Sequence, residues 1–199
     1  MAFQCIVDNS YPRLCMYICV LKPKKKKKKK RTRIKKAMRG QESVETPVGV
    51  PASIAWDAYR GLEFGRLVDE LLGNVVGKVE VVEGDGGVGT IMKLTFPPGT
   101  PGSGYMKEIY TKMDDDNRVK ETEIIEGGYK DLGFDHVRIR LEIIEKDDAA
   151  AESSIIRSTI EYEMDETKPE LASFVSTKQL EIMAETIGKY LIDKNSSTA

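Results

Sequence analysis

The sequence has few of the residue types on which metal sites and nucleophilic enzymes depend. Its three cysteines, Cys5, Cys15 and Cys19, all lie near the N-terminus, and His136 is its one histidine. The rest of the chain can therefore form no disulfide or thiolate cluster. Cys15 and Cys19 have no nearby partners for a four-ligand zinc site, so we expect no metal. This cysteine usage favours a reducing compartment, the cytoplasm, with the nucleus as the alternative.

Long hydrophobic runs are also missing. The longest apolar stretch, "LCMYICVL", is far shorter than the roughly 20 residues that a membrane-spanning helix needs. Its basic residues follow the apolar stretch, whereas a secretory signal places them first. We therefore expect no membrane association.

Positive charge is scarce outside the N-terminal segment. Residues 1–37 hold ten lysines and three arginines against one acid, a net charge of +12, so the remainder carries −13 of the overall −1. Such an acidic domain lacks the basic face that phosphates require, and we expect no nucleic-acid partner for it. The lysine run could be a nuclear-import or nucleic-acid patch. We favour a disordered, solvated extension, or a gene-model artefact in which the true start is Met38.

The most glycine-rich stretch, "EGDGGVGT" at 83–90, could in principle bind a phosphate. A phosphate-binding loop lies between a strand and a helix, so that the helix N-terminus faces the anion. This loop instead separates two segments of alternating polarity, and no Gly-Lys-Ser/Thr follows it. We therefore predict a tight hairpin in which glycines supply positive φ angles, and no nucleotide cofactor.

Residue periodicity predicts an α+β domain over residues 38–199. A strand at 41–50 is followed by two short helices at 51–60 and 62–72. Six segments then alternate with a period of two: 78–83, 90–96, 105–113, 118–125, 135–144 and 154–164. Apolar residues recur every three or four positions from Pro169 to about Asp193, as in one long amphipathic helix. Consecutive strands joined by short turns indicate an antiparallel sheet, with the long helix covering one face.

Alternation also predicts which side chains face this helix. In "RVKETEII", Glu121 and Glu123 share the parity that suits water, which turns Lys120 inward. In "DHVRIRLEII", the apolar set that includes Ile139 faces inward and His136 faces solvent. A solvated histidine leaves no partner for the usual Ser/His and Cys/His nucleophiles.

A lysine and a carboxylate on the inner face could carry acid–base chemistry. In "YMKEIYTKM", Met106, Glu108 and Tyr110 share one face. Burial lowers the pKa of a lysine such as Lys120 toward neutrality and makes it a usable base. A carboxylate such as Glu108 can donate or accept protons beside it. The alternatives are that the pair anchors a ligand or forms a purely structural buried ion pair.

Three stretches carry a family resemblance: "EVVEGDGGVGTIMKLTFPPG", "NRVKETEIIEGGYKDLGF" and "IIRSTIEYEMDE". They closely resemble the Bet v 1 (class-10 pathogenesis-related) family of plants, and within it the norcoclaurine synthase-like branch and the similar norbelladine synthases. The resemblance covers residues 38 to about 194. It implies a curved seven-stranded antiparallel sheet wrapped around a long C-terminal helix (a helix-grip, START-like fold). Two short helices would form a V, with a large apolar cavity inside.

The resemblance also implies a set of catalytic residues. In the synthases that this chain resembles, a tyrosine, a glutamate and a lysine condense dopamine or tyramine with an aromatic aldehyde through an iminium. Carried over by position, the lysine is Lys120 and the glutamate is Glu108. The tyrosine is Tyr105 by the Tyr-x-x-Glu spacing of norbelladine synthases, although its parity opposes that of Glu108 unless the strand start is irregular. The Tyr-x-Glu spacing of norcoclaurine synthases reaches Met106. Ile139 stands where those synthases have an aspartate, and norbelladine synthases look apolar there.

The same logic nominates residues for the cavity wall. The candidates for ligand binding are Phe96, Tyr110, Tyr129, Ile139, Phe174, Met183 and Ile187. The resemblance implies an enzyme of plant alkaloid biosynthesis that joins an aromatic ethylamine to an aromatic aldehyde without a cofactor. The alternative is a non-catalytic, defence-related protein that binds a hydrophobic ligand or hormone, including an abscisic acid receptor-like protein. We expect a monomer or weak dimer with a small aromatic or hydrophobic ligand.

Overall fold

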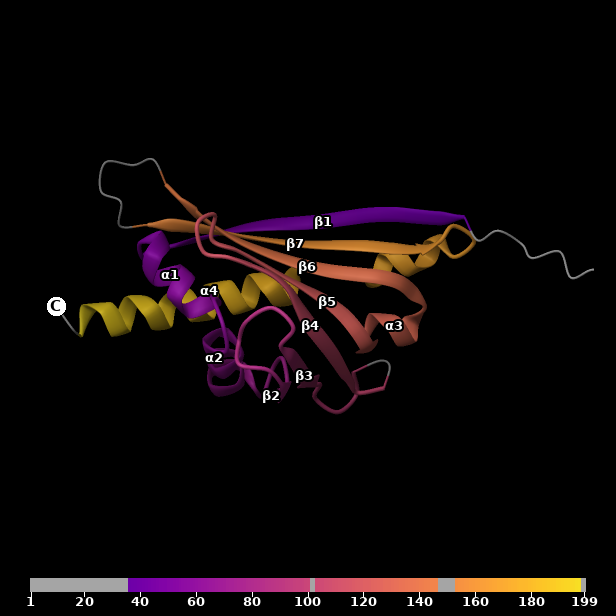
Figure 1. Ribbon diagram of the computed structural model, residues 1–199, viewed down its shortest axis with the longest axis horizontal. Helices are drawn as coiled ribbons and strands as arrows, with labels where there is room; N and C mark the ends of the chain where they lie inside the picture. Colours follow the sequence, from indigo (N-terminus) through magenta and orange to yellow (C-terminus); the bar gives the residue numbers. More distant parts are fainter. Residues whose placement is uncertain (1–35, 101–102, 147–152, 198–199) are drawn as a thin grey trace, which may run out of the picture. The chain divides into compact units, whose positions relative to one another are not determined.

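The computed structural model describes residues 36–100, 103–146 and 153–197, which form one antiparallel sheet with helices on one face (Figure 1). The predictions for the N-terminal extension therefore lie almost entirely outside the described residues. No helix within the described ranges is both long and apolar enough to span a membrane. In the same ranges, no group of three His, Cys, Asp or Glu side chains could hold a metal ion.

The sheet has seven strands in the order β1-β7-β6-β5-β4-β3-β2, and every neighbouring pair is antiparallel. The strands are β1 (Ala37–Val48), β2 (Lys78–Glu83), β3 (Ile91–Thr95), β4 (Tyr105–Asp114), β5 (Val119–Gly127), β6 (Phe134–Glu145) and β7 (Ser154–Asp165). The α+β fold class and all seven predicted strands are confirmed. β1 begins earlier than predicted because it pairs with β7 along its whole length, as far as Ala37 opposite Asp165.

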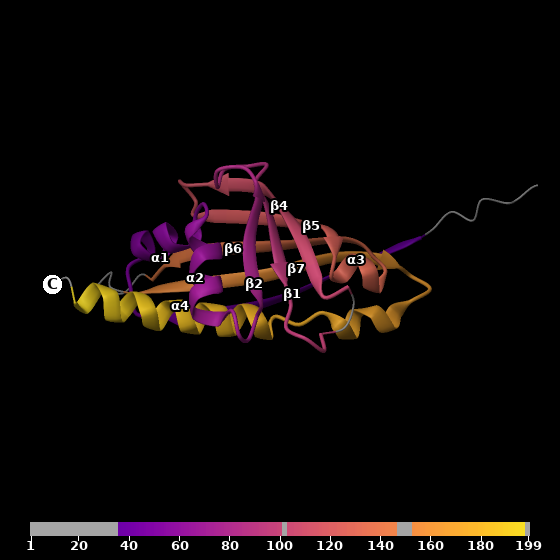
Figure 2. The same ribbon diagram turned by 90° about the horizontal axis from the view of Figure 1, so that it is seen from below.

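Within the described residues, four α-helices and one short 3₁₀ helix lie in the β1–β2 connection, in the β5–β6 connection and after β7. They are α1 (Ala52–Tyr59), α2 (Glu63–Leu72), α3 (Tyr129–Leu132) and the 3₁₀ helix η1 (Pro169–Phe174), followed by the longest helix, α4 (Lys178–Ser196). Figure 2 shows α4 running along the sheet, with α1 and α2 beside it. The single turn of α3 was not predicted.

The C-terminal helix is interrupted, and the prediction of one helix from Pro169 onward is wrong there. Val175 has an extended backbone (φ −79°, ψ 129°) and is buried. The three residues Val175–Thr177 are β-branched or hydroxyl-bearing types that favour helix ends over helix interiors. α4 then begins at Lys178, whose main-chain N–H donates to the Ser176 hydroxyl at 3.3 Å.

The glycine-rich loop forms the predicted hairpin between β2 and β3. Gly84, Gly86 and Gly89 all have positive φ. A Cβ added at Gly86 would lie 3.1 Å from the Cα of Gly61, so the loop packs closely against the turn between α1 and α2. The hairpin thereby holds that turn against the sheet.

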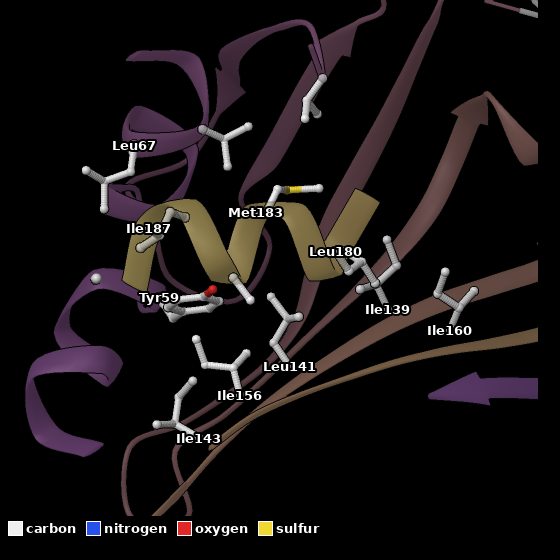
Figure 3. Close-up of a cluster of buried hydrophobic side chains, with 14 of the residues drawn as sticks. Tyr59, Leu67, Ile139, Leu141, Ile143, Ile156, Ile160, Leu180, Met183 and Ile187 are labelled. Atoms are coloured by element: carbon white, nitrogen blue, oxygen red, sulfur yellow. The ribbon is translucent and has the colours of Figure 1, made fainter. Parts of the chain in front are cut away.

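The core lies between the sheet and α4 (Figure 3). The predicted inward set on β6 is buried: Val137, Ile139, Leu141 and Ile143. Residues from β7, α1, α2 and α4 complete the cluster, among them Ile156, Ile160, Tyr59, Leu67, Met183 and Ile187. The inward parity predicted for β6 is thus confirmed.

Candidate active site

A narrow pocket lies at the inner face of the sheet, between strands β2 to β6 and helices α2 and α4. Its volume is about 70 Å³, room for a few waters and well below the roughly 300 Å³ of typical small-molecule sites. The large cavity that the resemblance implies is therefore not open here. Phe64 and the methionines Met92, Met106 and Met183 occupy its walls. Methionine is unbranched and adapts its shape, so these walls can move.

An ion pair and a side-chain hydrogen bond on the outer face of the sheet hold the orientation of β5. Glu121 pairs with Arg140 at 2.6 Å, and Glu123 contacts the His136 ring at 3.0 Å. Because successive strand residues point to opposite faces, these contacts turn Lys120 inward. The predicted parity of β5 is confirmed, and His136 lies on the outer face.

Lys120 is almost completely buried, with 1% of its surface exposed. Its Nζ lies 3.9 Å from the ring centroid of Tyr110 and 5.2 Å from that of Phe64. The same atom donates to the main-chain carbonyls of Tyr59 and Gly61, each at 3.4 Å. The ammonium is therefore held by two aromatic faces and by the α1–α2 turn.

Burial sets the protonation of this lysine. Loss of water lowers the pKa of Lys120 to about 8, although the negative charge of Glu108 opposes the shift. Burial also raises the pKa of Glu108, against the charge of Lys120 and a hydrogen bond that the Thr122 hydroxyl donates at 3.1 Å. No ion pair joins Lys120 to Glu108 within the part of the chain that the structure describes. The geometry therefore places a weakened base and a weakened acid in one apolar pocket, rather than a mutually satisfied pair.

The pocket brings together five of the residues nominated from the sequence: Glu108, Tyr110, Lys120, Ile139 and Met183. Five others do not line it: Tyr105, Phe96, Tyr129, Phe174 and Ile187.

Tyr105 lies on the opposite face of β4 from Glu108. Its hydroxyl donates to Glu126 at 2.5 Å, and the Lys107 ammonium binds the same carboxylate at 2.7 Å. The start of β4 pairs regularly with β3, with Tyr105 opposite Thr95. The pairing of β4 with β5 does shift between Lys107 and Glu108, but the extra residue, Ile125, belongs to β5, so the shift does not turn the Tyr105 ring inward. The structure does not bring Tyr105 to the predicted catalytic group.

The remaining four residues are displaced by packing. Phe174 ends η1 and is 52% exposed, because the helix breaks immediately after it. Tyr129 packs edge-on against Phe134, with ring centroids 5.4 Å apart. Ile187 is fully buried in the core on α4, and Phe96 follows the end of β3. These four residues therefore do not line the narrow pocket.

Thr122 and Phe64 are among the pocket residues that the sequence analysis did not nominate. Thr122 shares the parity of Lys120, so alternation could have found it. Phe64 reaches the pocket only because α2 packs across the sheet, and no local pattern signals that contact.

The chain has close relatives among named plant proteins. Norbelladine synthase from Narcissus pseudonarcissus is 44% identical over 160 residues, which cover 80% of this chain and 96% of that protein. S-norcoclaurine synthase 1 from Papaver somniferum is 37% identical over 159 residues, covering 79% and 67%.

A solved structure has the same fold. Norcoclaurine synthase from Thalictrum flavum, in complex with dopamine and hydroxybenzaldehyde, has a TM-score of 0.68 and 30% identity. The match covers 79% of this chain and 88% of that one. Residues 37–194 match the family described as the pathogenesis-related protein Bet v 1 family. The seven-stranded sheet, the long C-terminal helix and these matches together establish that the chain belongs to the Bet v 1 family.

Proposed function

We propose that this protein condenses an aromatic ethylamine with an aromatic aldehyde, with Glu108 as the acid and Lys120 as the base. The observation that carries the proposal is the buried lysine of pKa about 8 in an apolar pocket beside a buried carboxylate. Perturbed groups of this kind are concentrated at catalytic sites. The relatives' names, and the dopamine and hydroxybenzaldehyde held by the related structure, support this substrate class.

Glu108 would assist the loss of water. The amine nitrogen bonds to the aldehyde carbon, and the resulting carbinolamine loses its hydroxyl once a proton reaches that oxygen. Because burial raises the pKa of Glu108, part of the carboxyl stays protonated closer to neutral pH and can donate that proton. Water leaves and an iminium remains.

Lys120 would complete the reaction by taking a proton. With a pKa of about 8, about a tenth of its side chain is neutral at pH 7. The neutral amine accepts the N–H proton of the iminium and leaves the imine. Lys120 gains one proton and Glu108 loses one. Transfer of a proton from Lys120 to Glu108 then returns both side chains to their starting protonation states.

The pocket favours a product that ends at the C–N bond. Ring closure requires removal of a further proton from the aromatic ring. Glu108 and Lys120 already serve the first steps, and Met106 and Ile139 offer no additional base. The norcoclaurine synthases that this chain resembles have an aspartate at the position of Ile139. We therefore propose the imine, rather than a cyclised product, as the main product.

The test is an assay of the full chain with tyramine and 3,4-dihydroxybenzaldehyde, with cyanoborohydride present to trap the imine as a secondary amine. We expect product above the rate without protein, and a loss of about 100-fold or more in Glu108→Gln and Lys120→Met. Glu126→Gln removes a carboxylate from the outer face of the sheet and should leave the rate unchanged.

Two results would contradict the proposal. If tyramine binds without any product above background, the protein belongs with non-catalytic ligand binders. If Glu126→Gln slows the reaction as much as Glu108→Gln, the chemistry does not take place in this pocket. A parallel assay with dopamine and 4-hydroxyphenylacetaldehyde, analysed by chiral chromatography, tests whether a cyclised product forms.

A further inference from the structure

The hydroxyl of Tyr59, the last residue of α1, is buried without a partner. Only 1% of the residue is exposed, and no described residue forms a hydrogen bond with its Oη. A buried hydroxyl without a partner is unfavourable and uncommon in folded proteins. Phenylalanine would fill the same space without this cost, so the hydroxyl itself requires an explanation.

Tyr59 lies next to residues that line the pocket. Its ring lies 4.8 Å from that of Phe64, between centroids, and its main-chain carbonyl accepts a hydrogen bond from Lys120. It also packs in the same core cluster as Leu141 and Met183, which line the pocket. The ring thus lies directly behind the wall near Lys120.

The direction of the hydroxyl is visible in Figure 3. The oxygen points away from α1 and into the space between α4 and the sheet, where Leu141 also projects. No described residue forms a hydrogen bond with this oxygen, so a group that binds it must be water or a ligand. A widening of the pocket through movement of Met183, whose side chain is unbranched, would bring that space within reach of an aromatic ligand.

We infer that the Tyr59 hydroxyl binds the ring hydroxyl of a phenolic substrate, so that the pocket selects hydroxylated over unsubstituted aromatic rings. The inference rests on the proposed function. It adds that the ring hydroxyl is the end of the substrate that reaches inward. A tyrosine hydroxyl can both donate and accept, and a phenol offers both complements. Burial also raises the pKa of Tyr59, which keeps the hydroxyl neutral and able to donate. Tyr59 is here a specificity residue and takes no part in proton transfer.

The test compares binding by isothermal titration calorimetry, without turnover, in wild type and Tyr59→Phe. One pair of probes is tyramine and 2-phenylethylamine, and the other is 4-ethylphenol and ethylbenzene. We expect wild type to prefer the hydroxylated member of each pair by roughly 3- to 10-fold. Tyr59→Phe should lose this preference while its affinity for the unsubstituted members stays the same.

A second readout and a control address folding. The melting temperature of Tyr59→Phe should be equal to or above that of wild type, because the variant removes only an unpaired hydroxyl. Tyr162→Phe deletes the hydroxyl of a tyrosine that packs against the same core outside the pocket. It should retain the wild-type preference.

The possible failures are distinguishable. If Tyr59→Phe keeps the preference, or if wild type shows none for either pair, the inference is overturned and the hydroxyl is satisfied by water or not at all. If 4-ethylphenol shows the expected pattern but neither amine binds, the inference stands while the proposed reaction fails at its amine substrate.

Discussion

Lys120→Met should make the protein more stable at neutral pH while abolishing its proposed chemistry. The fall in the pKa of Lys120 from 10.5 to about 8 corresponds to a cost of about 3 kcal/mol for burying the charged form. Methionine has a similar length and no charge, so it avoids this cost. We expect the free energy of unfolding to rise by about 3 kcal/mol at pH 7, or roughly 5–10 °C in melting temperature.

The gain should depend on pH in a defined direction. Since the pKa is lower in the folded state than in the unfolded chain, the unfolded state binds more protons between about pH 8 and 10.5. The free energy of unfolding of the wild type therefore rises with pH across that window, as far as Lys120 contributes to it. Below the window, the full cost of burying the charged lysine applies. The advantage of Lys120→Met should be largest below pH 8 and should disappear near pH 10.5.

The assay is urea unfolding followed by fluorescence of Trp56, the one tryptophan in the chain, at several pH values from 7 to 10.5. Lys112→Met is the matched control, because Lys112 is a partly exposed lysine paired with Asp114, and surface pairs of this kind contribute about 0–1 kcal/mol. A Lys120→Met protein that is less stable than wild type at pH 7, or a difference that does not vary with pH, would refute the burial argument.

Three further predictions follow from the same geometry. The profile of kcat/KM against pH should be bell-shaped. Its alkaline limb should begin near pH 8, the pKa of Lys120, and its acid limb should begin at the raised pKa of Glu108. A profile that is flat between pH 6 and 9 would exclude this pair. Tyr105→Phe should retain wild-type kcat/KM because its hydroxyl bonds on the outer face, and a large loss would show that this ring reaches the substrate. Gly86→Ala should destabilise the fold by more than the roughly 1–3 kcal/mol of backbone strain alone, since its added Cβ also meets the α1–α2 turn. Gly89→Ala is the control, because its added Cβ meets open space. Equal losses of stability in urea unfolding would contradict the packing role of this loop.

Local patterns were enough to place the two residues on which the proposed chemistry depends. β2 lies at the predicted 78–83, and Lys120 and Glu108 face inward as alternation requires. Strand alternation is a property of the backbone, so a short window of sequence reveals it. The same parity rule indicated that Tyr105 opposes Glu108, and the regular register of β4 with β3 bears this out.

The C-terminal segment shows where local patterns fail. Its apolar spacing predicts one continuous helix, yet Val175 is drawn into the core in an extended conformation and Phe174 turns to solvent. Helical periodicity reports that one face is apolar. It does not report whether the sheet has room for that face along its whole length.

The sequence by itself determined the order of the seven strands along the chain, the inward face of β5 and β6 and the family to which the chain is similar. Only the tertiary structure decided what surrounds those residues: the width of the pocket, the aromatic contacts of Lys120 and the unpaired hydroxyl of Tyr59. Lys120 reaches the Tyr59 carbonyl across 61 positions of sequence. The pKa of a buried group depends on such distant neighbours and on the water that they exclude, and no local pattern of residues encodes either.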